Sequence, residues 1–186
     1  MPASQETTQE MSQDFHLLPL SAEADDNEIL QAVGTAPLEL SPESQFCVFR
    51  SGRERFCLPV LDVEEVLEWL LLTKIPLGPA YLIGIFNLRG SIIPLIDIAM
   101  TEGRRPGLLP KHVVVAVLKG QRGQEDIRIG IAADEVIGTY SVSAEDLLES
   151  SPENVPYCTG MLRHDDRLAL LIDLRRLLEA FPGPSI

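Results

Sequence analysis

Residues 87–97 read Asn-Leu-Arg-Gly-Ser-Ile-Ile-Pro-Leu-Ile-Asp, a polar turn that runs straight into an apolar segment. The apolar segment is short, rich in β-branched residues and bounded by Gly90 and Asp97, which is typical of a buried strand. Gly90 permits a sharp entry into that strand, because glycine tolerates backbone conformations closed to other residues. Pro94 has no amide hydrogen, so we expect the strand to lie at a sheet edge or to carry a bulge there. The pattern therefore holds Arg89 at the mouth of a rigid β element.

Short apolar runs separated by turns rich in Gly and Pro recur on both sides of this segment. They predict strands over 46–50, 55–59, 112–118, 127–134, 135–142, 157–163 and 167–172. Residues 63–72 have helical spacing but are crowded with β-branched and bulky side chains, so helix and strand both stay open. Short helices are expected over 80–86, from Ser143 to 146, and over 174–181. Many short strands without alternating strands and helices indicate small barrels or a sandwich.

Charge is distributed unevenly along the 186 residues, whose net charge is −13. Residues 1–45 hold nine acidic residues and no basic one, which leaves 19 acids and 15 bases for the rest. This balance argues against nucleic acid and against an anionic membrane surface as partners. Residues 1–44 are polar and lack a sustained apolar period, which predicts a disordered acidic tail. We therefore expect a folded domain over 45–181 and a short C-terminal tail over 182–186.

The three cysteines indicate a reducing compartment. Cys47, Cys57 and Cys158 are odd in number and lack metal-type spacing, as expected for thiols in the cytosol. The N-terminus has no basic segment followed by an apolar core, so no secretory signal is predicted. The longest apolar stretch, near 66–72, is far too short to span a bilayer. The sequence thus predicts a cytoplasmic protein without a membrane-inserted segment.

The common signatures of an active site are missing from the sequence. The three histidines are scattered, and no phosphate-binding glycine loop or Gly-x-Ser-x-Gly elbow occurs. We expect Asp97 to end a strand, Asp165 and Asp166 to form a hairpin turn, and Cys158 to be a half-buried structural thiol. No catalytic residue, metal or cofactor is therefore predicted. A small β-barrel enzyme that uses Asp97, Asp165 or Cys158 stays a remote alternative, because catalytic groups assemble in space.

Four separated pieces of the chain are specific in combination and in order. The first is 56–66, Phe-Cys-Leu-Pro-Val-Leu-Asp-Val-Glu-Glu-Val, and the second is 81–97, which opens Tyr-Leu-Ile-Gly-Ile-Phe-Asn-Leu-Arg-Gly. The third is 129–136, Ile-Gly-Ile-Ala-Ala-Asp-Glu-Val, and the last is Thr159-Gly160 followed by Leu-Leu-Ile-Asp at 170–173. Together they resemble the CheW-type chemotaxis adaptor family over about residues 45–181. The resemblance implies a mainly β fold of two intertwined five-stranded SH3-like barrels, with short helices and a C-terminal helix.

The resemblance also implies a function without enzymatic activity. Such an adaptor couples transmembrane chemoreceptors to a CheA-type histidine kinase, and it works in the cytoplasm beside membrane receptor arrays. The implied partners are the helical tip of the receptor and the regulatory domain of the kinase. An alternative keeps the fold but serves pilus-based or gliding motility, or a chemosensory pathway outside motility. The residues implied at the receptor or kinase interface are Val63, Glu65, Val66, Asn87, Arg89, Gly90, Ile129 and Gly130.

Overall fold

The computed structural model describes residues 44–68, 70–99, 109–121, 123–148, 150, 154–164 and 166–182. All of them belong to one compact unit, Glu39–Ile186. The predicted acidic tail, apart from its last residue, lies outside the described residues, and so do Trp69 and most of the C-terminal tail.

The described residues form strands, two 3₁₀ turns and one α-helix. The first half holds β1 (Gln45–Ser51), β2 (Glu54–Pro59), the 3₁₀ turn η1 (Val60–Asp62), β3 (Val63–Leu67), β4 (Leu72–Thr73), β5 (Leu82–Leu88) and β6 (Ser91–Ile96). The second half holds β7 (His112–Leu118), β8 (Ile127–Ala133), β9 (Glu135–Ser141), the 3₁₀ turn η3 (Ala144–Asp146), β10 (Leu147–Leu148), β11 (Cys158–His164), β12 (Arg167–Ile172) and α2 (Leu174–Ala180).

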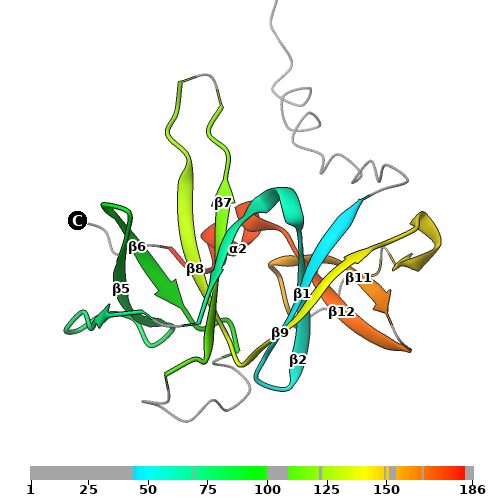
Figure 1. Cartoon of the computed structure of the whole chain (residues 1–186), viewed down its shortest axis with the longest axis horizontal. Coiled ribbons are helices and arrows are strands. Elements are labelled where there is room, and N and C mark those ends of the chain that lie inside the picture. Colours follow the sequence, from blue (N-terminus) through cyan, green and yellow to red (C-terminus); the bar gives the residue numbers. More distant parts are fainter. Residues whose placement is uncertain are drawn as a thin grey trace, which may run out of the picture. The chain divides into compact units, whose positions relative to one another are not determined.

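Two sheets share the chain in an interleaved order. Within the described residues, the first sheet runs β10-β11-β12-β2-β1-β9 and the second runs β3-β7-β8-β6-β5-β4. The chain therefore starts in the first sheet, builds all of the second, and returns to the first at β9 (Figure 1). This confirms the predicted mainly β fold of two intertwined SH3-like barrels. Each sheet has six strands instead of five because a two-residue strand, β4 or β10, extends one edge.

Buried side chains divide into three clusters, because successive residues of a strand point to opposite faces. The first-barrel core consists of Phe46, Val48, Cys57, Val142, Leu162, Ala169 and Leu171. The second-barrel core consists of Phe86, Ile93, Leu95, Val113, Val115 and Ala132. A larger shared core receives the alternate residues, among them Val114 and Ala116 of β7, Leu170 and Ile172 of β12, and Leu174 and Leu177 of α2. Continuous apolar strands such as β7 are thus explained by burial on both faces.

The three predicted helices, and the segment 63–72 that could be helix or strand, had different outcomes. The helix predicted over 80–86 is wrong, because these residues enter β5, which pairs with β6 along its whole length. The segment 63–72, for which helix and strand were both possible, forms β3 and leads into β4. The helix opened by Ser143 is a single 3₁₀ turn, and the Ser143 hydroxyl donates to Asp146 at 2.7 Å instead of capping a backbone amide. The C-terminal helix is confirmed as α2, and the Asp173 carboxylate accepts the amides of Arg175 and Arg176.

Pro94 lies in an internal strand, so the edge-strand expectation is wrong for β6 as a whole. β6 pairs with β5 on one side and with β8 on the other. However, the ladder to β8 begins only at Leu95, so at Pro94 the strand has a paired neighbour, Ile85, on one side alone. The irregularity in the β5–β6 ladder lies between Leu82 and Gly84 and not at Pro94. The missing amide is tolerated because pairing to β8 has not yet started.

Candidate functional site

The turn between β5 and β6 places Arg89 in a left-handed backbone conformation. Arg89 has a φ of 51° and Gly90 a φ of 90°, and positive φ at both central residues is the pattern of a type I′ hairpin turn. The Asn87 side-chain oxygen accepts the Gly90 amide at 2.9 Å. Glycine adopts this conformation freely, whereas an arginine there costs about 1 kcal/mol or more. Arg89 therefore lies in the turn that enters β6, as predicted, and its backbone is strained, whereas the rigidity of this turn stays a prediction.

Arg89 forms an ion pair with Glu65 of β3. The Arg89 Nη2 atom lies 3.2 Å from Glu65 Oε2, and the two side chains are 74% and 22% exposed. β3 is at the edge of the second sheet and β5 is four places along it, so this contact requires the sheet to curl on itself. An ion pair this exposed contributes only about 0.2–1 kcal/mol to stability. The pair thus closes the barrel at this point without being a large stabilising term.

The second oxygen of Glu65 is in an unusual position. Glu65 faces Val115 in the β3–β7 register, so its side chain lies on the same side of the sheet as the second-barrel core. Glu65 Oε1 is buried and has no hydrogen-bond partner among the described residues. Leaving a buried acceptor unsatisfied costs roughly 1–3 kcal/mol. The stability of the described domain therefore does not explain why a carboxylate occupies this position.

Two exposed apolar side chains lie close in sequence to the residues of the ion pair. Val66 follows Glu65 and is 39% exposed, and Ile92 follows the turn and is 62% exposed. Ile92 pairs with Asn87 across the β5–β6 hairpin. We call these five residues, Glu65, Val66, Asn87, Arg89 and Ile92, the Arg89 surface. Sequence reasoning missed Ile92, although strict alternation with the buried Ile93 would have placed it on the outer face.

The remaining predicted interface residues lie behind this surface. Val63 is half-buried and packs against the shared core, and Ile129 is a buried member of that core. Gly130 pairs with Val115 on one side and with Leu95 on the other. A Cβ atom on Gly130 would lie 2.8 Å from a ring carbon of Phe86. The structure thus exposes Val66, Asn87, Arg89 and Gly90, leaves Glu65 partly buried, and places Ile129 and Gly130 inside.

The residues weighed for catalysis have structural positions. Asp97 is buried, its carboxylate accepts the Ala99 amide at 3.0 Å, and its own amide donates to Tyr81, so it ends β6 as expected. Asp166 lies in the β11–β12 turn with a φ of 57°, and Asp165 is outside the described residues. Among the described residues, no group of three or more His, Cys, Asp or Glu side chains is arranged to hold a metal ion.

All three cysteines are buried. Burial raises the pKa of each thiol above its ordinary value, and for Cys158 it raises the pKa to about 12. Because the thiolate is the nucleophile, these thiols are unreactive near neutral pH. Cys158 is fully buried and not half-buried as expected, since β11 places it in the shared core.

Buried thiols make the stability of the domain fall at high pH. The Cys158 pKa is 9.0 in an exposed chain and about 12 in the fold, so unfolding releases its proton above pH 9. Stability is fully present below pH 9 and is lost as the pH rises towards 12, by about 1 kcal/mol at pH 10 for this thiol. Urea unfolding at pH 8 and pH 10 measures the loss. Cys158→Ala should lose less between the two conditions than the unmodified chain, and an equal loss would contradict the prediction.

Comparison with known proteins gives consistent matches. Residues 45–181 match the model of the CheW-like domain family. The probable chemotaxis protein CheW of Rhizobium etli is 30% identical over 140 residues, which cover 73% of this chain and 87% of that protein. The chemotaxis protein CheW of Klebsiella aerogenes is 30% identical over 142 residues, covering 73% and 82%. The crystal structure of the scaffolding protein TtCheW from Thermoanaerobacter tengcongensis superposes with a TM-score of 0.61 at 25% identity, covering 75% of this chain and 90% of that one.

No helix among the described residues is long and apolar enough to cross a membrane.

Proposed function

The chain belongs to the CheW-like domain family, and from this premise we propose that it is a non-catalytic adaptor in chemotaxis. In this role it couples transmembrane chemoreceptors to a CheA-type histidine kinase. It works in the cytoplasm beside the receptor arrays, and residues 45–181 carry the activity. The observation that supports the proposal best is the Arg89–Glu65 ion pair, which occupies positions that the family resemblance implies for partner binding.

The energetics of this ion pair favour recognition over stability as its purpose. Arg89 sits in a strained turn, and one Glu65 oxygen is buried without a partner. Strained and unsatisfied groups are retained where a binding function compensates for their cost. Charges at the rim of an interface set the register and orientation of a partner more than its affinity. We therefore assign Arg89 and Glu65 the role of orienting a receptor helix or the kinase regulatory domain.

Apolar neighbours supply contact area for the same partner. Val66, next to Glu65 in β3, and Ile92, in β6 just after the Arg89 turn, are both exposed. A helical receptor tip docks through apolar anchors on one face with charges at the rim, which is the helix-in-groove mode of recognition. Ile129 and Gly130 act indirectly in this proposal. They pack β8 between β7 and β6, and these strands position the residues in contact with the partner.

A reconstitution experiment tests the proposed function. The purified chain is mixed with a soluble receptor cytoplasmic tip and with the regulatory domain of the kinase, and complexes are measured by pull-down. We expect binding to both, and an increase in kinase autophosphorylation when receptor, adaptor and kinase are combined. Binding to neither would contradict the proposal. Binding only to the receptor and kinase of a pilus or gliding system would place the adaptor in that pathway instead.

A further inference from the structure

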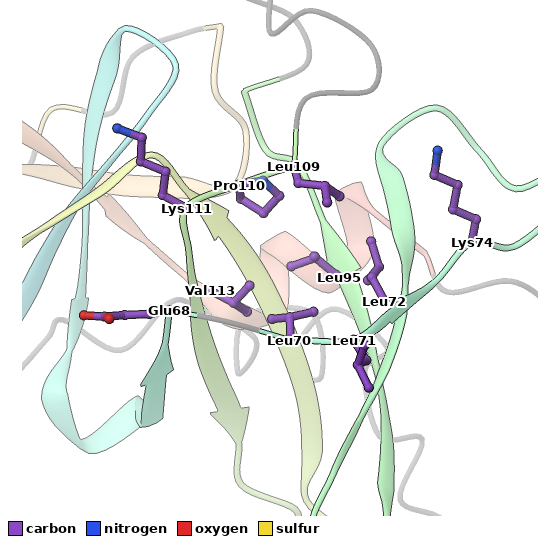
Figure 2. Close-up of a pocket in the computed structure, with 10 residues that line it drawn as sticks. All are labelled: Glu68, Leu70, Leu71, Leu72, Lys74, Leu95, Leu109, Pro110, Lys111 and Val113. Carbon is purple, nitrogen blue, oxygen red and sulfur yellow. The ribbon is translucent and has the colours of Figure 1, made fainter.

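A pocket of about 600 Å³ opens on the second barrel. Its lining comes from the segment between β3 and β5, from β6, and from the start of β7 (Figure 2). The lining residues are Glu68, Leu70, Leu71, Leu72, Lys74, Leu95, Leu109, Pro110, Lys111 and Val113. None of them belongs to the Arg89 surface, so the two sites are lined by different residues.

The pocket is an opening into the second-barrel core. Leu95 and Val113 are buried members of that core, and Leu70 and Leu72 pack against it. At the rim, however, Leu71 is 87% exposed and Leu109 is 61% exposed. Within the described ranges of the chain, the apolar core therefore continues into exposed leucines and is incomplete at that place. Further apolar side chains inserted there would remove leucine surface from water, at about 25 cal/mol for each Å².

The arrangement of polar groups favours a protein segment over a small molecule. Small-molecule pockets of this volume place a few polar groups so that they converge on the ligand. Here Lys74, Lys111 and Glu68 lie around the leucines with their charged ends pointing outward (Figure 2). An apolar centre with a charged rim is the pattern of a protein interface. A helix suits a compact centre of this kind, because residues three and four positions apart present side chains on one face.

The charges at the rim of the pocket indicate the sign of the charge on the partner. Lys74 and Lys111 lie on opposite sides of the leucines, and neither pairs with a carboxylate among the described residues (Figure 2). Two lysines without an ion pair in the part of the chain that the structure describes stand out on a chain with a net charge of −13. Glu68 lies on a third side and would repel a carboxylate there, which restricts the orientation of an acidic partner.

We propose that this pocket binds an amphipathic acidic helix of a protein partner. Leucine-sized side chains of that helix insert against Leu95 and Val113, and its carboxylates pair with Lys74 and Lys111. The proposal is independent of the receptor and kinase contacts assigned to the Arg89 surface, because the two sets of residues do not overlap.

Peptide binding to the full chain tests the proposal. The probe is an alanine-based helical peptide with leucines three and four residues apart on one face and glutamates along both borders of that face. The comparison peptide has lysine at every glutamate position. Fluorescence anisotropy should show the glutamate peptide binding at least about tenfold more tightly than the lysine peptide. The preference should shrink at high salt, because rim charges are screened.

Variants of the chain distinguish peptide binding in the pocket from unspecific electrostatic attraction. Lys74→Glu combined with Lys111→Glu is expected to weaken the glutamate peptide about tenfold. Arg53→Glu reverses the charge of an exposed arginine in the β1–β2 turn of the other sheet and should leave binding unchanged. Leu71→Ser should weaken both peptides without unfolding the domain, because Leu71 is already exposed.

Three results would overturn the proposal. One is equal affinity for the two peptides, and another is unchanged binding in the double lysine variant. The third is a dimer of the chain, seen by analytical ultracentrifugation, that Leu71→Ser dissociates, because a second copy would then be the occupant of the pocket.

Discussion

Replacing Gly130 with valine is expected to destabilise the domain by about 3 kcal/mol. A Cβ atom there would lie 2.8 Å and 3.1 Å from two ring carbons of Phe86, and 3.1 Å from a methyl carbon of Val113. Both neighbours are buried in the second-barrel core, so neither can move away without disturbing other contacts. The branched valine adds two further carbons to this clash. Urea unfolding followed by circular dichroism measures the loss.

A smaller substitution at a matched position provides the control. Gly130→Ala should cost about 2 kcal/mol, whereas Gly78→Ala should stay within about 0.5 kcal/mol. The closest atoms to a Cβ on Gly78 lie 3.4 Å away, which is ordinary contact. The same experiment separates packing from recognition at Gly130. Unchanged stability together with lost receptor or kinase binding would make Gly130 a contact residue and contradict its assignment to the interior.

Replacing Arg89 with glycine is expected to weaken receptor and kinase binding about tenfold or more while leaving the fold intact. Glycine relieves the left-handed strain at this position, and this gain offsets the entropy that glycine loses on folding and the lost ion pair. The free energy of unfolding should therefore change by less than about 1 kcal/mol. Asp166→Gly is the matched control, because Asp166 has a similar φ of 57° in the β11–β12 turn. It should change neither stability nor binding.

Exchanging the charges of Arg89 and Glu65 tests whether a partner contacts them. Arg89→Glu and Glu65→Arg are each expected to weaken receptor coupling, since each replaces the ion pair with two like charges. The double variant restores an attractive pair and should regain stability. It should not regain binding, because the partner meets each charge with the opposite sign. If binding recovered fully in the double variant, the pair would act only within the chain, and the orienting role would be wrong.

Sequence patterns predicted the strands that have a clear apolar period or are bounded by clear turn residues. The hairpin of β1 and β2, the buried strand β7 and the hairpin of β11 and β12 lie where Gly, Asp and polar turns bound apolar runs. The helix predicted over 80–86 was wrong, because a seven-residue apolar stretch fits a helix and a strand equally well. Its pairing with β6 decided between them, and that pairing involves hydrogen bonds that local sequence does not encode. The 63–72 segment was undecided for the same reason.

In the candidate site, too, some features were predictable from local sequence and others were not. The turn at Arg89 and Gly90 was predictable, since glycine after a polar residue marks a tight hairpin. The partner of Arg89 within the chain was not, because Glu65 lies 24 positions away on a strand at the far edge of the same sheet. The interior location of Ile129 and Gly130 also depended on their neighbours, β6 and β7. The family resemblance predicted which positions belong to the interface, and packing in the folded domain decided which of these residues face outward.

The sequence by itself determined the class of fold, the turn that holds Arg89, and the lack of the usual catalytic motifs. These follow from local rules, because alternation, glycine and proline act over a few residues. Only the tertiary structure decided that Arg89 meets Glu65, that Gly130 leaves room for Phe86, and that the second-barrel core opens between Lys74 and Lys111. The physical reason is that curling a sheet brings distant strands together, and the residues that meet there are set by the register of the whole barrel.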